Sequence, residues 1–333
     1  NVNQMAEVVE PKVIEWRRDF HQNPELSNRE FETSKKVAAF LEGLGMEVQT
    51  GIAHTGVVGV LKGGKPGPVV ALRADMDGLP VTERVDLPFA SKVKSEYNGI
   101  ESGVMHACGH DTHMAMLMGA AEILTKMKKD LKGTVKFVFQ PAEEGVPPGE
   151  DGGANMMVKD GALKNPDAEV IFGLHIDAQT DVGKVTYKPR GALAASQRFV
   201  IKVHGKQAHG SSPWEGVDPI VISAQIINGL QNLVSRDTEL TKEAAVISVG
   251  LIRGGVRNNI IPEEVEMVGT IRTLDYDMQA KLNEMMKFRV KSIAESYGGS
   301  ADIEIEKGIP ITYNDPELTA KMVPTLERSA GKE

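Results

Sequence analysis

The feature that most constrains the fold is an alternation of strand and helix patterns along the first half of the chain. Apolar residues at helical spacing predict helices over Arg29–Leu44 and Asp111–Lys129. Short aliphatic runs predict strands at Val57–Leu61, Val69–Leu72, Thr134–Phe139 and Val170–Leu174. Because strands that alternate with helices build a sheet with helices on its faces, the sequence predicts an α/β domain with a mixed, mostly parallel sheet.

The pattern changes after Arg190. The expected elements are then a strand at Phe199–Val203, a helix at Asp218–Ser235, strands at Ala245–Ile252 and Val265–Thr273, a helix at Asp277–Tyr297 and a strand at Ala301–Glu306. This β-α-β-β-α-β order is that of a ferredoxin-like unit. We therefore expect one domain made of residues 1–189 and 308–333, with a second domain, residues 190–307, inserted into it. A last helix is expected over Asp315–Ala330, with its N-cap at Asn314 or Asp315.

The composition excludes several classes of protein. The formal net charge of −8 argues against a nucleic acid as the main partner, and no apolar run reaches the roughly 18 residues of a membrane-spanning helix. The only cysteine, Cys108, cannot form a disulfide within the chain. The first residue is Asn rather than Met, which is compatible with removal of an export signal, so exported and cytoplasmic locations both stay open.

Acidic and imidazole side chains follow three predicted strands of the first domain. Asp75 and Asp77 follow Val69–Leu72, the pair Glu143 and Glu144 follows Thr134–Phe139, and His175 comes directly after Leu174. In open α/β sheets, ligands bind at the carboxyl ends of the strands. We therefore expect these groups to line one binding site at that edge of the sheet.

The segment Met105–His113 adds a fourth set of polar groups. It contains three of the eight histidines, among them His110, beside Cys108. Cys108 and His110 flank a glycine, so a tight turn could direct both at one ion. Thiolate and imidazole bind zinc and related divalent ions, and carboxylates complete mixed sites. Each residue alone would more often be a buried or solvated side chain, but together with the strand-end groups they predict a metal site.

The two consecutive glutamates can divide the chemistry between them. A metal ligand must point at the ion, whereas a general base must point at the water that the ion holds. Consecutive residues that leave a strand project differently, so both can line one pocket while only one binds metal. The alternative is that Glu143 and Glu144 are exposed residues at the start of the loop Gly145–Gly153.

Four motifs together resemble the M20 metallopeptidase family: "RADMDGLP" (73–80), "MHACGHDTHMAM" (105–116), "QPAEEG" (140–145) and "GLH" (173–175). They most resemble its amidohydrolase branch of aminoacylases, hippurate hydrolases and auxin-conjugate hydrolases. Residues 204–220 and 254–274 resemble the lid of that family. The resemblance implies a hydrolase of N-acyl amino acids with two divalent metal ions, Mn²⁺ or Zn²⁺. It also implies a homodimer formed through the lid domain.

The resemblance also implies roles for individual residues. The metal ligands would be Cys108, His110, Glu144 and His175. Glu143 would be the general base and Asp75 would orient a ligand, with Asp77 a weaker candidate for that task. In the lid, His209 would stabilise the oxyanion, often in the site of a partner subunit, while Asn259 and Arg272 would contact the substrate. The Arg272 guanidinium would bind the substrate carboxylate.

One departure from the family keeps alternatives open. The family carries a last histidine ligand beyond a position like Glu333, and this sequence has no histidine after His209. We therefore expect either that the chain is part of a longer protein or that one metal lacks a protein ligand. A dipeptidase of the same fold and a non-catalytic ligand-binding protein are the alternatives. The peptidase branches usually place an aspartate where this sequence has the Cys108/His110 pair, which argues against the first.

Overall fold

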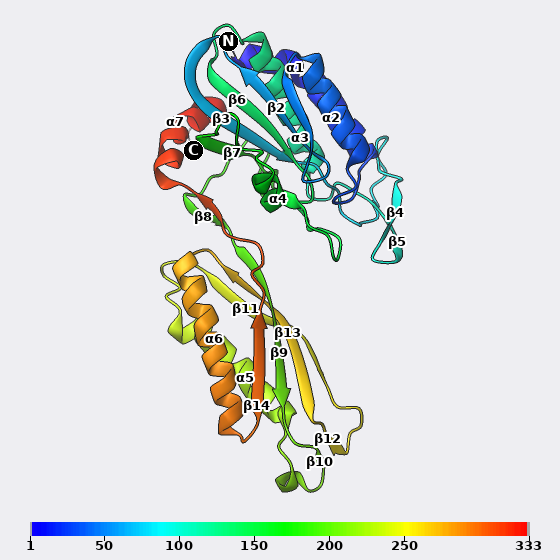
Figure 1. The fold of residues 1–333 in the computed structure, drawn as a ribbon, viewed down its shortest axis with the longest axis vertical. Helices are drawn as coiled ribbons and strands as arrows, with labels where there is room; N and C mark the ends of the chain where they lie inside the picture. Colours follow the sequence, from blue (N-terminus) through cyan, green and yellow to red (C-terminus); the bar gives the residue numbers. More distant parts are fainter. Residues whose placement is uncertain (1, 332–333) are drawn as a thin grey trace. The chain divides into compact units, whose positions relative to one another are not determined.

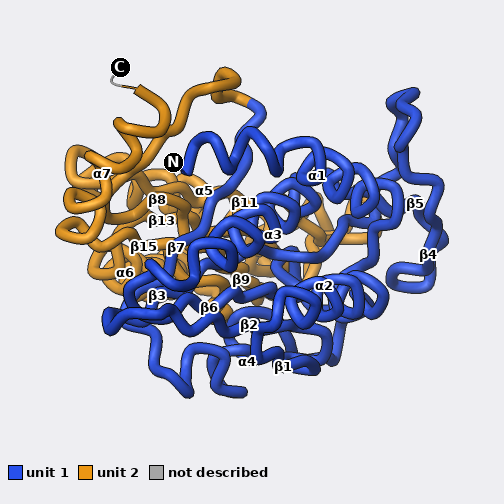
Figure 2. Tube along the Cα trace, turned by 90° about the horizontal axis from the view of Figure 1, so that it is seen from above, with its two compact units in different colours: residues 1–178 blue, residues 179–333 orange. Residues whose placement is uncertain are grey.

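The computed structural model describes residues 2–331 and divides the chain into two compact units, residues 1–178 and 179–333 (Figure 1, Figure 2). Among the described residues, no helix combines the length and the apolar character that crossing a membrane would require.

The first unit is built on a five-stranded sheet. In spatial order its strands are β1 (Glu47–Ile52), β2 (Gly56–Lys62), β6 (Lys132–Gln140), β3 (Lys65–Asp75) and β7 (Val170–Gly173). The pairings of β6 with β3 and of β3 with β7 are parallel, and the other two are antiparallel. The prediction of a mixed sheet is therefore confirmed, but "mostly parallel" is wrong. Only a short turn, residues 53–55, joins β1 to β2, and such a connection permits only an antiparallel pair.

Helices cover both faces of this sheet. The helices of the first unit are α1 (Val2–Gln22), α2 (Phe31–Gly43), α3 (His110–Lys126) and α4 (Gly153–Lys159), and a hairpin is formed by β4 (Lys94–Tyr97) and β5 (Ile100–Gly103). On β6, Phe137 and Phe139 pack against residues of α1, α2 and α3, whereas the intervening Val138 packs against Met157 of α4. Because successive side chains of a strand point to opposite faces of the sheet, the first unit has two cores, one on each side of the sheet that the helices cover (Figure 1).

The parallel strands deliver their carboxyl ends to one edge of the sheet. Asp75 at the end of β3 lies opposite Gln140 at the end of β6, and Arg73 lies opposite Gly173 at the end of β7. The residues that follow these ends therefore emerge side by side, as the sequence predicts.

The second unit has a four-stranded antiparallel sheet in the order β11-β13-β9-β14. Its strands are β8 (Arg190–Leu193), β9 (Ala195–His204), β10 (Ala208–His209), β11 (Ala245–Gly254), β12 (Ile260–Ile261), β13 (Glu264–Thr273), β14 (Ser300–Ile305) and β15 (Thr312–Asn314). Its helical segments are η1 (Pro213–Glu215), α5 (Pro219–Asn232), η2 (Leu233–Asp237), α6 (Tyr276–Ser296) and α7 (Pro316–Ala330). Two short ladders, β10 with β12 and β15 with β8, accompany the main sheet.

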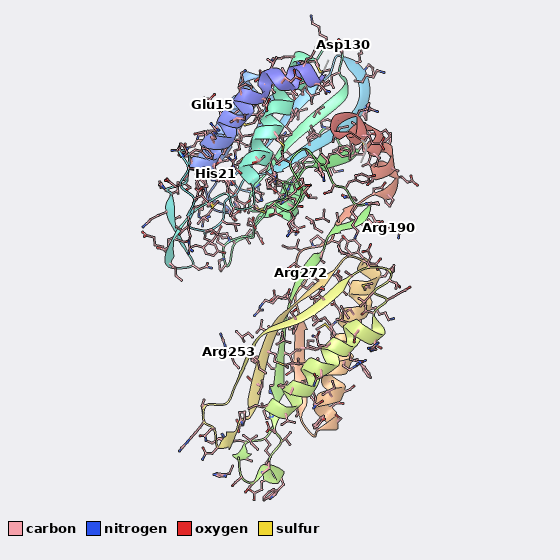
Figure 3. All side chains as sticks on the ribbon, turned by 180° about the vertical axis from the view of Figure 1, so that it is seen from behind. Glu15, His21, Asp130, Arg190, Arg253 and Arg272 are labelled. Carbon is pink, nitrogen blue, oxygen red and sulfur yellow. The ribbon has the colours of Figure 1, made fainter. Side chains whose placement is uncertain are left out.

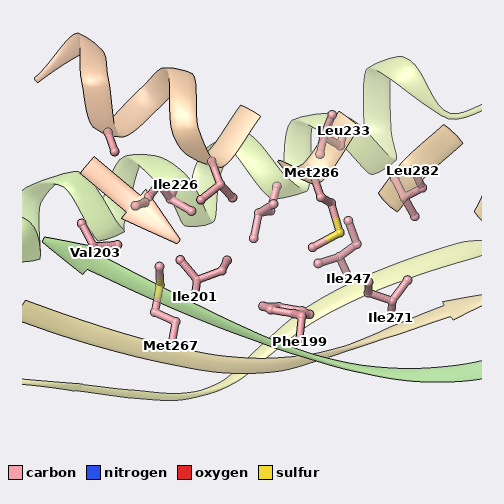
Figure 4. Packing of buried hydrophobic residues seen from close by; sticks show 14 of the residues in the cluster. Phe199, Ile201, Val203, Ile226, Leu233, Ile247, Met267, Ile271, Leu282 and Met286 are labelled. Carbon is pink, nitrogen blue, oxygen red and sulfur yellow. The ribbon is translucent and has the colours of Figure 1, made fainter. Parts of the chain in front are cut away.

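The core of the second unit lies between one face of this sheet and the helices α5 and α6 (Figure 4). Alternate residues of β9, Phe199, Ile201 and Val203, are fully buried and pack in one cluster with Ile226 and Met286. An aspartate caps the start of each long helix by accepting backbone N–H groups. For α7 the cap is Asp315 rather than Asn314.

Candidate metal centre

The turn between Cys108 and His110 is fixed by Gly109. Its φ of +85° is in the left-handed region, and α3 begins directly after it at His110. A Cβ atom on Gly109 would also overlap Cγ2 of Ile176. Glycine is therefore required here on two grounds, and the turn places the thiol and the imidazole on the same side of the helix start.

His110 is the centre of the site. Its ring is fully buried, and its Nδ1 donates to the carbonyl oxygen of Asp77 at 2.8 Å, so the lone pair of the neutral ring is on Nε2. Nε2 is buried and has no hydrogen-bond partner among the described residues. Three groups of possible metal ligands all contain His110, with ligand atoms within 4.8 Å of one another: Cys108 with His175, Glu143 with Glu144, and Asp75 with His113.

His175 is oriented in the same way as His110. Its Nδ1 donates to the carbonyl oxygen of Ile176 at 2.6 Å, which leaves its Nε2 lone pair 3.5 Å from Sγ of Cys108. In a metal-binding histidine, one ring nitrogen usually donates a hydrogen bond to an acceptor, which leaves the other nitrogen free to bind the metal. Both imidazoles thus present Nε2 lone pairs to the same small region.

Asp77 fixes the backbone of the glutamate pair. The Asp77 carboxylate accepts the backbone N–H groups of Glu143 at 3.1 Å and of Glu144 at 3.0 Å. Each glutamate carboxylate lies 3.8 Å from Nε2 of His110, and the side chains are 39% and 21% exposed, respectively. Burial, together with the Asp75 and Glu144 charges, raises the pKa of Glu143 above its ordinary value. The more exposed of the two carboxylates can therefore meet both the ion site and a water molecule.

Asp75 reaches the site through a second histidine. Its carboxylate accepts from Nδ1 of His113 at 2.6 Å and from Arg73 at 2.6 Å, and it lies 3.5 Å from Nε2 of His110. Nε2 of His113 accepts the backbone N–H of Ile176 at 2.9 Å, so both ring nitrogens of His113 are occupied. His113 is therefore a positioning group between Asp75 and the His175–Ile176 peptide rather than a ligand.

The donor set fits divalent cations. Burial and then the neighbouring carboxylates Glu144, Glu143 and Asp75 raise the pKa of the Cys108 thiol to about 12. A cation among these groups reverses that preference, since it stabilises a thiolate and separates like charges. Thiolate, two imidazoles and carboxylates form a mixed set that suits zinc and related ions.

Substitution of Gly109 tests the turn. Gly109→Ala is expected to lower the affinity for Mn²⁺ or Zn²⁺ by at least about tenfold, the low end for loss of ligand support, because Cys108 and His110 can no longer share one direction. Metal titration by calorimetry measures this. Gly51→Ala is the matched control, because Gly51 has a similar φ of +74° but open space around its Cβ. Equal metal affinity in the two variants would contradict the requirement for this turn.

Sequence patterns gave no indication of the contacts behind the site. His21 of α1 bonds Asp111, the residue after His110, at 2.9 Å and also Glu83 at 3.1 Å. Hydrogen bonding to Asp111 raises the pKa of His21. Glu30 is fully buried, and burial raises the pKa of its carboxyl to about 7. His21 and Glu30 precede the motifs by tens of positions, and only their burial and their partners in the folded chain reveal them.

In the second unit, His209 and Asn259 are neighbours. His209 pairs with Ile260 across the β10–β12 ladder, and the N–H of Gly210 donates to the carbonyl oxygen of Asn259 at 2.9 Å. Nδ1 of His209 accepts the N–H of Ser211 at 3.2 Å, so the neutral ring carries its proton on the exposed Nε2. His209 can therefore donate a hydrogen bond outward.

Arg272 lies on β13 of the main sheet, near the end of that strand that is farther along the chain from the β10–β12 ladder. It follows Glu264, the first residue of β13, by eight positions, which corresponds to roughly 26 Å along a strand. Figure 3 labels Arg272 and also Arg253, the partner of Glu266 on β11, at different places along the sheet. Arg272 is half-buried and contacts Thr270 and the carbonyl oxygen of Ile271. The structure thus brings His209 and Asn259 together but not Arg272.

Comparisons with known proteins agree on one family. Residues 71–333 match peptidase family M20/M25/M40. The chain is 43% identical over 320 residues to thermostable carboxypeptidase 2 of Saccharolobus solfataricus, covering 96% of this chain and 78% of that protein. It is 38% identical to the N-acyl-L-amino acid amidohydrolase of Geobacillus stearothermophilus, covering 95% and 81%. A Bacillus subtilis structure described as a dinuclear metal binding peptidase of family M20 superposes with a TM-score of 0.81 at 36% identity, covering 97% and 80%.

Proposed function

The chain belongs to peptidase family M20/M25/M40, and from that premise we propose that it hydrolyses the amide bond of N-acyl amino acids. The observation that carries the proposal is the buried Nε2 of His110, which has no hydrogen-bond partner in the described part of the chain and is surrounded by Cys108, His175 and the glutamate pair. Relatives named as an amidohydrolase and as N-acetylcysteine deacetylases support this reaction class.

Two divalent ions, Mn²⁺ or Zn²⁺, would be held by Cys108, His110, Glu144 and His175. When bound, such ions lower the pKa of a water molecule and polarise the substrate carbonyl. The Bacillus subtilis relative, described as dinuclear, supports a pair rather than a single ion. The chain supplies Asp77 to orient His110 and both glutamates, and Asp75 acts on His175 through His113 and Ile176.

Glu143 would move the proton. Its carboxylate takes a proton from the attacking water and hands it to the leaving amine. Asp77 accepts a hydrogen bond from the backbone N–H of Glu143, so the Glu143 side chain extends from a fixed backbone position. The exposed Nε2–H of His209 would donate to the carbonyl oxygen as negative charge develops on it. Arg272 would bind the free carboxylate of the amino-acid half, and Asn259 would add a contact to the substrate.

The second unit contributes the lid in this proposal. The catalytic domain would comprise residues 1–189 and 308–333, and residues 190–307 would form a ferredoxin-like lid inserted into it. The strand order β11-β13-β9-β14 with two helices on one face supports the ferredoxin-like assignment. The pairing of β8 with β15 supports an insertion, because it joins the segments on either side of residues 195–309.

A homodimer through the lid would complete the substrate site. His209 and Arg272 are separated by roughly 26 Å or more of strand within one chain, far more than the length of a small N-acyl amino acid. If both contact the same substrate, they must come from different copies. A twofold symmetric dimer supplies His209 of one copy to the site of the other, and vice versa.

A peptide substrate is the second candidate. The 43% identical relative is named a carboxypeptidase. A carboxypeptidase also cleaves the amide bond next to an amino acid with a free carboxylate, so the Arg272 role would be unchanged. The two activities differ only in what lies on the acyl side of that bond.

The proposed function is tested with a substrate panel and metal removal. We expect turnover of acetyl- and benzoyl-amino acids, loss of that turnover after chelation, and recovery on adding Mn²⁺ or Zn²⁺, measured as released amino acid. Amides of the same amino acids without a free carboxylate should be cleaved at least about tenfold more slowly, since a charged hydrogen bond is lost. Preferred cleavage of dipeptides would instead favour the peptidase. A chain that binds the panel without turnover would be a binding protein.

A further inference from the structure

The backbone immediately before the glutamate pair is strained. Ala142 has φ of +49°, in the left-handed region that residues with a Cβ seldom occupy. Such a conformation persists only where the surroundings hold it, and it recurs at functional sites. The direction in which Glu143 and Glu144 leave β6 therefore depends on what fixes Ala142.

The side chain of Glu30 accepts a hydrogen bond from Ala142. Oε1 of Glu30 accepts the backbone N–H of Ala142 at 2.8 Å, across 112 positions of sequence. Oε2 accepts the hydroxyl of Thr55 at 2.7 Å. The Glu30 side chain is fully buried, and its residue immediately precedes the start of α2. Both carboxylate oxygens are thus committed to fixed partners on separate elements.

The residues just before Glu30 also contact the surroundings of the glutamate pair. Ser27 donates to Oδ2 of Asp77 at 2.7 Å, and Asp77 in turn holds the N–H groups of both glutamates. Asn28 donates to Glu150 at 3.0 Å and to the carbonyl oxygen of Asp151 at 3.1 Å, beyond the glutamate pair. Residues 27–30 therefore contact the chain directly before and after the glutamates, at Ala142 and at Glu150 and Asp151, and they reach the glutamates through Asp77.

If Glu30 only filled space in the fold, its side chain would not need to be a carboxyl group. Burying a carboxyl group is unfavourable unless its hydrogen bonds offset the loss of solvation, and an apolar side chain of similar size would fill the space. What only an acceptor provides is a partner for two donors, the hydroxyl of buried Thr55 and the N–H of a strained Ala142. The negative charge of Asp77 further disfavours the charged form of Glu30, so a carboxyl group at this position carries an electrostatic penalty.

We propose that Glu30 is a positioning residue for the reaction, which sets the direction of the Glu143 carboxylate by holding the N–H of Ala142. The inference rests on the proposed function of Glu143. Glu30 touches neither substrate nor metal ligand side chains, and it acts entirely through the backbone of the loop. Ser27 and Asn28 assist by fixing Asp77 and the end of the loop.

Three variants at one position test the proposal. Glu30→Met fills the buried volume without an acceptor, and we expect kcat to fall by about tenfold to a hundredfold, as for a misplaced catalytic group, while KM changes less than about twofold. Glu30→Gln can accept from Ala142 through Oε1 and donate to Thr55 through its amide nitrogen, so it should restore kcat to within about threefold of the wild type. Glu30→Ala should resemble Glu30→Met in kcat per folded molecule.

Controls separate this proposal from the proposed function. Glu32→Gln, an exposed glutamate of α2 paired with Lys35, should leave kcat and KM unchanged. The fraction of folded molecules is measured by circular dichroism, and metal content by mass spectrometry. Wild-type kcat in Glu30→Met, or a loss that Glu30→Gln does not restore, would overturn the positioning role. A wild-type chain that is inactive on the whole panel would instead overturn the proposed function.

Discussion

Replacing Glu143 by glutamine is expected to lower kcat at least about a hundredfold, the low end for loss of a general base, while the metal ions remain bound. The amide cannot accept the proton of the attacking water, but it has nearly the same shape. Asp77 holds the backbone N–H of residue 143 and not its side chain, so the loop should keep its conformation. Steady-state rates on an N-acetyl amino acid and the metal content of the purified variant measure the two effects.

The adjacent residue is the matched control. Glu144→Gln has the same change in charge, one position along, with its backbone held by the other oxygen of Asp77. If Glu144 is the ligand, this variant should lose bound metal together with activity, whereas Glu143→Gln should lose activity alone. Metal loss in both variants would mean that both glutamates bind the ions and that the base lies elsewhere. Full activity in Glu143→Gln would remove it from the mechanism.

The part of the site that follows strands and a turn could be predicted from the sequence. The parallel strands β3 and β7 contain apolar runs that lead to polar residues at or just beyond the strand ends, as at Asp75 and His175. Since parallel strands end at one edge, chain order was enough to bring these groups together. Gly109 between two potential ligands predicted the turn, and the structure shows why only glycine fits there.

The antiparallel edge of the sheet could not be predicted in the same way. β1, Glu47–Ile52, is mostly exposed, with Ile52 its one buried residue, and its sequence contains no aliphatic run. α1 buries only Val9, Phe20 and His21 over its length, so few of its side chains belong to the core. Strand direction depends on connections and on neighbours in space, which single-strand patterns do not contain.

The residues that position the glutamates could not be predicted from the sequence, for a further reason. Glu30 and Ala142 are joined by one hydrogen bond across 112 positions, and neither has a spacing or a flanking motif that relates it to the other. Asp77 illustrates the same point, because the sequence ranks it below Asp75. In the structure the Asp77 carboxylate accepts the backbone N–H groups of both glutamates and its carbonyl oxygen accepts from His110, whereas the Asp75 carboxylate lies 3.5 Å from His110 and reaches His175 through His113. Ranking two similar carboxylates requires their partners.

Mixing two inactive variants, Glu143→Gln and His209→Ala, is expected to restore about a quarter of wild-type kcat. Each variant alone should lose at least about a hundredfold, the first for lack of a base and the second for lack of an oxyanion donor. After random exchange of subunits, half of the dimers are mixed. If His209 serves the partner's site, each mixed dimer has one site with both residues intact and one with neither.

The expectation follows from the geometry of the second unit, in which the His209 ladder precedes the start of β13 and Arg272 lies near the end of that strand. The control is a mixture of Glu143→Gln with Glu144→Gln. Both changes lie in the first unit of the chain, so no arrangement of subunits assembles an intact site, and no activity should return. If His209 acted on its own chain, the first mixture would be as inactive as this control, because every site would carry one defect. A recovery confined to the Glu143/His209 mixture would therefore establish both that the enzyme is a dimer and that each site draws a hydrogen-bond donor from the other copy.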